Sequence, residues 1–177
     1  MKKIITLALA TIIATSISFA QSYLGSSSTR TDIFGKSTTT HTDSYGRTTG
    51  YSTTSTDAFG RTTTTHTDEY GRTLGTSTAT VDYFGNIQVS HEDAYGRPTG
   101  HSTLSTDYFG NVIESRTDAY GHSTGSSISS VDYFGCTQTS HEDSYGRSIG
   151  STTTSTDYFG TTTSSHYGSY GSSIWSY

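Results

Sequence analysis

Histidine recurs at a fixed interval along the 177-residue chain, and this is the spacing with the clearest chemical meaning. Successive members of the series are separated by 25 residues, or by 50 where Arg116 takes the place of a histidine; the series comprises His41, His66, His91, His141 and His166. Stacked imidazoles near carboxylates can bind zinc or copper. A recurrent strand position beside a turn explains the same spacing without a metal, and arginine is a poor replacement for a ligand. We therefore treat the five histidines as weak metal candidates and expect no cofactor.

Aspartate forms two further series, each followed by an aromatic residue and a glycine. Asp-x-Phe-Gly occurs at Asp32–Gly35, Asp57–Gly60, Asp82–Gly85, Asp107–Gly110, Asp132–Gly135 and Asp157–Gly160, and Asp-x-Tyr-Gly at Asp43–Gly46, Asp68–Gly71, Asp93–Gly96, Asp118–Gly121 and Asp143–Gly146. Stacked carboxylates could hold calcium, but the glycine-rich nonapeptide of calcium-binding β-rolls is absent, and arginines recur four residues after several of the aspartates. We predict structural turns, in which Asp accepts backbone hydrogen bonds and Gly supplies a positive φ.

Nucleophilic catalysis finds no support in the sequence. No Gly-x-Ser-x-Gly elbow and no phosphate-binding glycine loop are present, and each Ser and His belongs to the repeat. The lone cysteine, Cys136, occupies a variable turn position and has no partner for an internal disulfide. We expect that the protein is not an enzyme.

The elements that carry these residues form a 25-residue unit of two turns and two linking segments. The segments consist largely of Thr, Ser, Val and Ile, which favour extended backbone, so each segment is predicted to be a short strand. Alternation within the longer segments predicts an inward face that includes Ser52 and Thr54 and an outward hydroxyl face that includes Thr53 and Ser55. We predict an all-β fold of tandem repeats, either a β-solenoid or a β-hairpin ribbon, in which laddered Phe and Tyr side chains provide most of the buried area.

The two ends of the chain differ from the repeats. Residues 1–20 combine two lysines, an apolar stretch and a small-residue cleavage site, as a secretory signal peptide does. We divide the remainder into a lead-in at 21–31, a β-repeat region at 32–165 and an atypical terminal repeat or cap at 166–177. We expect a secreted or cell-surface protein with no transmembrane span after signal cleavage. Loss of Lys2 and Lys3 changes the formal net charge from −5 to −7, which disfavours nucleic acid as a partner.

The segment from Asp57 to Arg72, with its paired Asp-x-x-Gly-Arg turns and Thr-rich strand, resembles the RHS/YD-repeat family. The resemblance covers residues 30 to about 171. It implies secreted or surface-exposed β-sheet shells and stalks, in some members around a toxin domain. This chain departs from the family in its aromatic residue before Gly and in its alternation of 11- and 14-residue spacings, and six units are too few for a closed shell.

These features lead to one principal functional hypothesis and two alternatives. The principal hypothesis is a non-enzymatic structural, adhesive or extracellular-matrix protein at a bacterial surface, with itself, a surface polysaccharide or another extracellular protein as partner. The first alternative is an ice-binding protein that uses outward Thr and Ser rows. These rows are Thr53/Ser55, Thr78/Thr80, Thr103/Ser105 and Thr153/Ser155, with Ile128 interrupting the array. The second alternative is an RHS-like accessory fragment.

Overall fold

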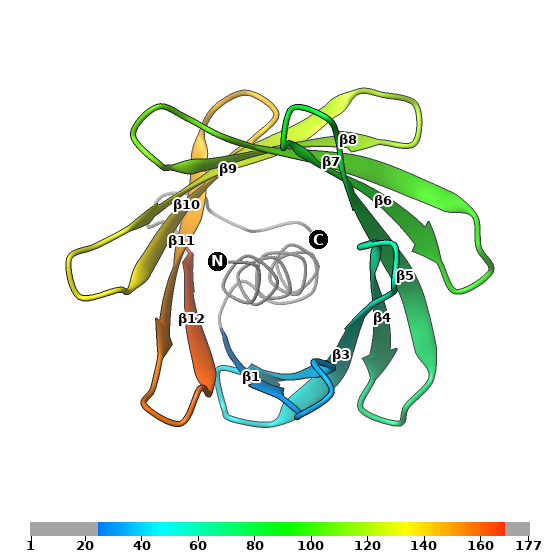
Figure 1. Ribbon diagram of the computed structural model, residues 1–177, viewed down its shortest axis with the longest axis vertical. Coiled ribbons are helices and arrows are strands. Elements are labelled where there is room, and N and C mark those ends of the chain that lie inside the picture. The colour runs from blue at the N-terminus through cyan, green and yellow to red at the C-terminus, as the bar shows by residue number, and fades with distance from the viewer. Residues whose placement is uncertain (1–24, 169–177) are drawn as a thin grey trace, which may run out of the picture.

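The computed structural model describes residues 25–168, which form one antiparallel β-sheet closed on itself (Figure 1). The described strands are β1 (Gly25–Thr31), β2 (Ser37–Asp43), β3 (Thr48–Thr56), β4 (Thr62–Asp68), β5 (Thr73–Val81), β6 (Ile87–Asp93), β7 (Pro98–Thr106), β8 (Val112–Asp118), β9 (Ser123–Val131), β10 (Thr137–Asp143), β11 (Ser148–Thr156) and β12 (Thr162–Gly168). Each strand pairs with its neighbour in the sequence, and β1 pairs with β12. The prediction of an all-β repeat fold is therefore confirmed.

The expected solenoid or open ribbon is wrong, because the two edge strands pair with each other. Gly25 of β1 lies opposite His166 of β12, and the pairing continues to Thr29 opposite Thr162. An open ribbon would leave both strands with unpaired backbone groups, and closure removes these edges. Like residues of consecutive repeats are also two strands apart, about 10 Å at ordinary strand spacing, so they cannot stack in ladders.

The strands of the barrel extend beyond the expected β-repeat region at both of its borders. Residues 25–31, within the expected lead-in, form β1, and residues 166–168, within the expected cap, complete β12. The expected signal peptide at 1–20 and the rest of the cap lie outside the described residues.

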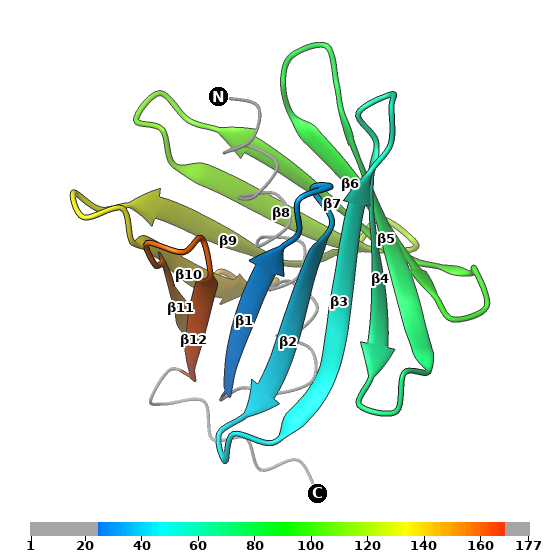
Figure 2. The same ribbon diagram turned by 60° about the horizontal axis from the view of Figure 1, so that its bottom comes forward.

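Alternating hairpins place the two turn types at opposite ends of the barrel (Figure 2). We call the end with the Asp-x-Phe-Gly turns the Phe end; the β1–β2 turn at Asp32–Gly35 belongs to it. The end with the Asp-x-Tyr-Gly turns is the Tyr end; the β2–β3 turn at Asp43–Gly46 belongs to it. In each turn the Gly N–H donates to the Asp carbonyl oxygen, and the Gly has a φ between 74° and 87°. This is the type I turn plus left-handed residue that closes many short hairpins.

The inner face of the wall is polar and made of small residues. Ser52 and Thr54 are buried, as the alternation predicts. Their equivalents on the other odd-numbered strands are buried too, except Ser129 and Thr154, which are half-buried. A small apolar cluster of Ala79, Val89 and Leu104 interrupts the hydroxyls on β5, β6 and β7. Paired hydroxyls such as Thr54 and Thr64, 2.8 Å apart, satisfy each other across neighbouring strands.

Glycines at the inner face allow neighbouring strands to approach closely next to a bulge. The β4–β5 register shifts between His66 and Thr67, where Gly75 lies opposite His66. A methyl group at Gly75 would overlap the carbonyl oxygen of Glu92 on β6. The repeated glycine is therefore required by packing within the wall as well as by turns.

Candidate functional site

The five histidines of the 25-residue series all lie on the inner face, on even-numbered strands, at one level of the barrel. A hydroxyl side chain from each intervening odd-numbered strand lies between successive members. We call this set of side chains the belt; its members are His41, Ser52, His66, Ser77, His91, Ser102, Glu114, Arg116, Ser127, His141, Thr152 and His166.

One arc of the belt runs from β2 to β7. Ser52 Oγ lies 2.8 Å from His41 Nε2 and 2.9 Å from His66 Nδ1. The same arrangement continues from His66 Nε2 to Ser77 at 3.2 Å, from Ser77 to His91 Nδ1 at 2.8 Å, and from His91 Nε2 to Ser102 at 3.1 Å. Each hydroxyl thus bridges the Nε2 of one imidazole and the Nδ1 of the next.

A second arc runs from β8 to β12 with the same polarity. Arg116 Nη1 donates to Ser127 Oγ at 2.8 Å, and Ser127 lies 2.9 Å from His141 Nδ1. Thr152 Oγ1 then lies 2.8 Å from both His141 Nε2 and His166 Nδ1.

Strand β8 is the exception in the belt because Arg116 replaces histidine and Glu114 replaces a smaller residue. Arg116 Nη1 lies 3.2 Å from Glu114 Oε2, and Glu114 is only 6% exposed. Burial raises the pKa of the Glu114 carboxyl, while Arg116 and the hydroxyls of Ser102 and Ser127 oppose this effect. The sequence identifies Arg116 as a departure from the series but does not single out Glu114. The available signal was that Glu114 stands where other units have Thr, Val or Ser.

Burial keeps the belt histidines neutral. Burial, with a smaller contribution from nearby histidine or arginine charge, lowers the pKa of His41, His66 and His141 from 6.5 to about 4. Burial also lowers the pKa of His91 and His166. Near neutral pH, each imidazole therefore offers one N–H donor and one nitrogen acceptor.

The belt geometry does not gather the histidines around a common point. Hydroxyl groups separate successive imidazoles, and within residues 25–168 no group of three or more His, Cys, Asp or Glu side chains could hold a metal ion. Hydroxyl groups already engage both ring nitrogens of His66, His91 and His141.

Every predicted turn aspartate accepts hydrogen bonds within its own turn. One carboxylate oxygen accepts from the backbone N–H groups two and four residues later, at 2.8–3.0 Å. In four Tyr-end turns the other oxygen pairs with an arginine, as in Asp43 with Arg47 at 2.8 Å, and in the β8–β9 turn Asp118 pairs with His122 at 3.0 Å. The Arg47 N–H is the largest cause that lowers the pKa of Asp43. These carboxylates are therefore engaged in holding turns.

The turn aromatics point into solvent, so the prediction that they supply the buried area is wrong. Phe59 is 97% exposed and Phe109 is 85% exposed. Each lies at the tip of a hairpin that projects beyond the sheet (Figure 2), where no second layer covers it. In four consecutive Phe-end hairpins a Tyr precedes the Phe, and the two rings meet edge to face, as Tyr108 and Phe109 do at 5.7 Å.

The Tyr end has a different surface chemistry. Its tyrosines are also exposed, but an arginine lies over the ring in four of the described turns, as Arg97 does over Tyr95 at 5.3 Å from the ring centre. The two ends therefore present different groups: bare aromatic tips at one and arginine-covered tyrosines at the other.

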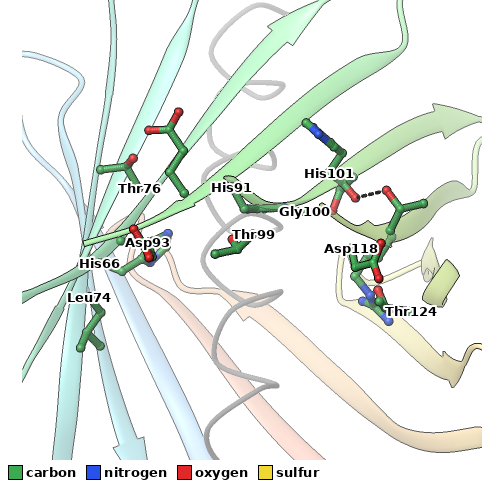
Figure 3. A pocket seen from close by; sticks show the side chains of 15 residues that line it. His66, Leu74, Thr76, His91, Asp93, Thr99, Gly100, His101, Asp118 and Thr124 are labelled. Carbon is green, nitrogen blue, oxygen red and sulfur yellow. Dashed lines mark hydrogen bonds between the residues drawn. The ribbon is translucent and has the colours of Figure 1, made fainter. Parts of the chain in front are cut away.

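A cavity of about 350 Å³ lies beside β5–β9, toward the Tyr end (Figure 3). His66, His91 and Arg116 of the belt contribute to its lining, together with Asp93 and Asp118. Both aspartates also hold their turns, so the cavity is an extension of the belt and the turns rather than a separate set of free groups.

The hydroxyl rows considered for ice binding lie on the outer face of β3, β5, β7 and β11. Because the sheet closes, successive rows face different directions around the wall and do not form one plane. Thr103 donates to Gln88 at 2.8 Å and Thr153 to Gln138 at 2.9 Å, so part of the array is engaged with neighbouring side chains. Cys136 is half-buried just after the Asp132–Gly135 turn, and its N–H donates to Asp132.

No family model matches the chain, and no curated protein matches it either. The resemblance to RHS/YD repeats therefore stays a prediction from the sequence. Among the described residues, no helix has the length and apolar character needed to cross a membrane.

Proposed function

We propose that this chain is a secreted, non-enzymatic protein with a structural or adhesive role at a bacterial surface, and that its Phe end is the contact surface. The observation that carries the proposal is the set of exposed aromatic tips on the six Phe-end hairpins. Each tip presents a Phe that is at least 85% exposed.

The Phe end repeats the same aromatic hairpin tip, and this repetition favours a partner that is itself a repeating polymer. A single exposed Phe or Tyr–Phe pair offers a small area, and its affinity for any ligand is low. Six tips held by one barrel engage a polymer simultaneously, and linked weak sites gain affinity by factors on the order of 10² to 10⁴. Aromatic faces stack on the C–H faces of sugar rings, so an extracellular polysaccharide is the partner whose chemistry fits best.

The interior supports a scaffold role in place of catalysis. The belt imidazoles are neutral and hydrogen-bonded to hydroxyl groups of neighbouring strands, whereas a catalytic site needs a group poised to react. The turn carboxylates are likewise engaged by backbone N–H groups.

Binding of residues 21–177 to insoluble chitin, cellulose and isolated bacterial cell walls tests the proposal. The test variant replaces four Phe-end aromatics: Phe84, Phe109, Phe134 and Phe159, each by Ser. The matched control replaces four Tyr-end aromatics: Tyr45, Tyr70, Tyr95 and Tyr145, each by Ser. We expect the wild type and the Tyr-end control to sediment with at least one of these polymers and the Phe-end variant to stay in solution. The proposal is wrong if the wild type binds none of them and remains monomeric, or if both variants bind equally well.

A further inference from the structure

The belt is a chain in which the direction of every hydrogen bond depends on its neighbours. A neutral imidazole has one N–H donor and one nitrogen acceptor, and a hydroxyl has one hydrogen to donate. Ser52 therefore cannot donate to both His41 and His66, which it bridges at 2.8 and 2.9 Å. If it donates to His66 Nδ1, then it accepts from His41 Nε2, and the same choice passes along the arc.

We propose that Arg116 and Glu114 set one direction for all hydrogen bonds of the belt, with Arg116 as the terminal donor and Glu114 as the terminal acceptor. We also propose that protonation of the belt at acid pH destabilises the barrel, and we call this property the latch. The direction assigns the hydrogen to Nε2 in all five belt histidines. This inference is independent of the surface role proposed for the Phe end.

Arg116 fixes the arc from β8 to β12 because a guanidinium only donates. Its Nη1 donates to Ser127 at 2.8 Å, which leaves the Ser127 hydrogen for His141 Nδ1 at 2.9 Å. His141 then carries its hydrogen on Nε2 and donates to Thr152, and Thr152 donates to His166 Nδ1.

Glu114 fixes the arc from β2 to β7 because an ionised carboxylate only accepts. The Ser102 hydroxyl is among the groups that lower the pKa of the Glu114 carboxyl, and a Ser102 hydrogen directed at that carboxylate leaves Ser102 to accept from His91 Nε2, 3.1 Å away. The same logic runs back through Ser77 and His66. The Ser127 hydroxyl lowers this pKa as well, and a Ser127 hydrogen directed to Glu114 would reverse the arc from β8 to β12.

Apart from Glu114, the belt is surrounded by hydroxyl groups and by carboxylates that their own turns engage. Odd-numbered strands β3, β5, β7, β9 and β11 contribute Ser or Thr at the belt level. At the Tyr end, the carboxylate two residues after each described belt position on β2, β4, β6, β8 and β10 shares its face; these are Asp43, Asp68, Asp93, Asp118 and Asp143. Each of them is engaged by its own turn. His101, on the outer face of β7, adds charge repulsion toward His91 when protonated.

A second proton on any belt histidine conflicts with this direction. Protonation of His141, for example, turns Nδ1 into a donor toward Ser127, which already accepts from Arg116. The Ser127 hydrogen then loses His141 as its acceptor, and Glu114, which already accepts from Arg116, is the group left in contact with it. Within the β8–β12 arc, reversing neighbours returns the extra donor to Ser127, because Arg116 does not accept. Each proton taken up therefore adds a donor and a positive charge to buried groups whose acceptors are already engaged.

The other repeat units suggest a variant that tests this proposal, because they show which residues stand at the positions of Glu114 and Arg116 on other strands. β4 has Thr64 and His66 at the two positions, so the double variant Glu114→Thr/Arg116→His converts β8 to the common pattern. Ser115 lies between them on the outer face, and Ser115→Ala is the matched control.

The experiment is two-dimensional NMR of ¹⁵N-histidine-labelled residues 21–177 at pH 8, which distinguishes protonated from unprotonated ring nitrogens. We expect all five belt histidines to be Nε2-protonated in the wild type and in Ser115→Ala, and the double variant to populate both tautomers. Nδ1-protonated His141 or His166 in the wild type would overturn the assigned direction, and this result does not depend on the variant's folding. Uniform Nε2 protonation in a folded double variant would show that β8 does not set it.

Lowering the pH of the wild-type sample in steps from 8 to 4 tests the latch. We expect the belt histidines to stay singly protonated while the backbone spectrum is dispersed, and both sets of signals to disappear together when the barrel opens. Belt histidines that become doubly protonated near pH 6.5 while the backbone spectrum stays dispersed would contradict the latch.

Discussion

Lowering the pH from 8 to 5 should destabilise the barrel through His66 and His141, which are each 4% exposed. Burial lowers the pKa of both imidazoles from 6.5 to about 4. The unfolded chain therefore binds protons at these residues as the pH falls through 6.5, whereas the barrel does not bind them until the pH approaches 4. Their contribution to stability is fully present above pH 6.5 and is lost progressively below it.

The expected size follows from this difference in pKa. At pH 5, linkage gives a loss of about 2 kcal/mol for each of the two histidines, or about 4 kcal/mol together. Domains commonly have only about 5–15 kcal/mol of stability in total. With a urea m-value on the order of 2 kcal/mol/M, the midpoint of unfolding should fall by about 2 M.

Urea unfolding followed by far-UV circular dichroism at pH 8, 7, 6 and 5 measures the effect. The variant His66→Gln/His141→Gln should lose about 4 kcal/mol of the dependence between pH 7 and 5, because Gln keeps polar groups in the belt but does not titrate; His41, His91 and His166 still contribute in the variant. His101→Gln, on the outer face, is the matched control and should behave as the wild type does. The turn aspartates titrate in every variant and cancel in the comparison. A wild-type pH dependence no steeper than that of the double variant would refute the reasoning.

Four further results are expected. Gly75→Ala should destabilise the barrel by more than 2 kcal/mol in urea unfolding, because its methyl overlaps the Glu92 carbonyl oxygen, whereas Gly85→Ala at a positive φ with open space around it should cost only about 1–2 kcal/mol. Asp93→Ala should lower stability by about 1–3 kcal/mol by the same assay, since two turn N–H groups lose their acceptor. Phe109→Ser should change the unfolding free energy by less than about 0.5 kcal/mol, as its ring packs against little of the barrel. Thermal melting should be identical with and without EDTA; a melting temperature that falls in EDTA would show a structural metal.

The turns and the alternation of the strands could be predicted from the sequence because they depend on residues close together in the chain. The Asp and Gly of each turn lie three residues apart, so their hydrogen bonds need no information from elsewhere. Strand alternation likewise placed Ser52 and Thr54 on the inner face. Closure could not be predicted in this way, because Gly25 and His166 are far apart in the sequence and the same repeat also fits an open ribbon.

The belt required knowledge of strand register. His41 and His66 recognisably belong to one series, but Ser52 lies 11 residues after one and 14 before the other, and only the hairpin register places it between them. Glu114 was missed because a single carboxylate in a repeat position carries no signal until the structure shows that it is buried beside Arg116. The exposed aromatics were mispredicted because composition shows how much apolar area a chain has but does not show where the turns project.

The measurement that tests the central claim most directly is the detection of cross-strand contacts between β1 and β12 by nuclear Overhauser effects in residues 21–177. The closed barrel predicts backbone contacts between Ser26 and Ser165 and between Ser28 and Thr163, with slow amide exchange on both strands. Contacts confined to the hairpins, with fast-exchanging amides on β1 and β12, would show an open sheet and would contradict the continuous wall on which the belt depends.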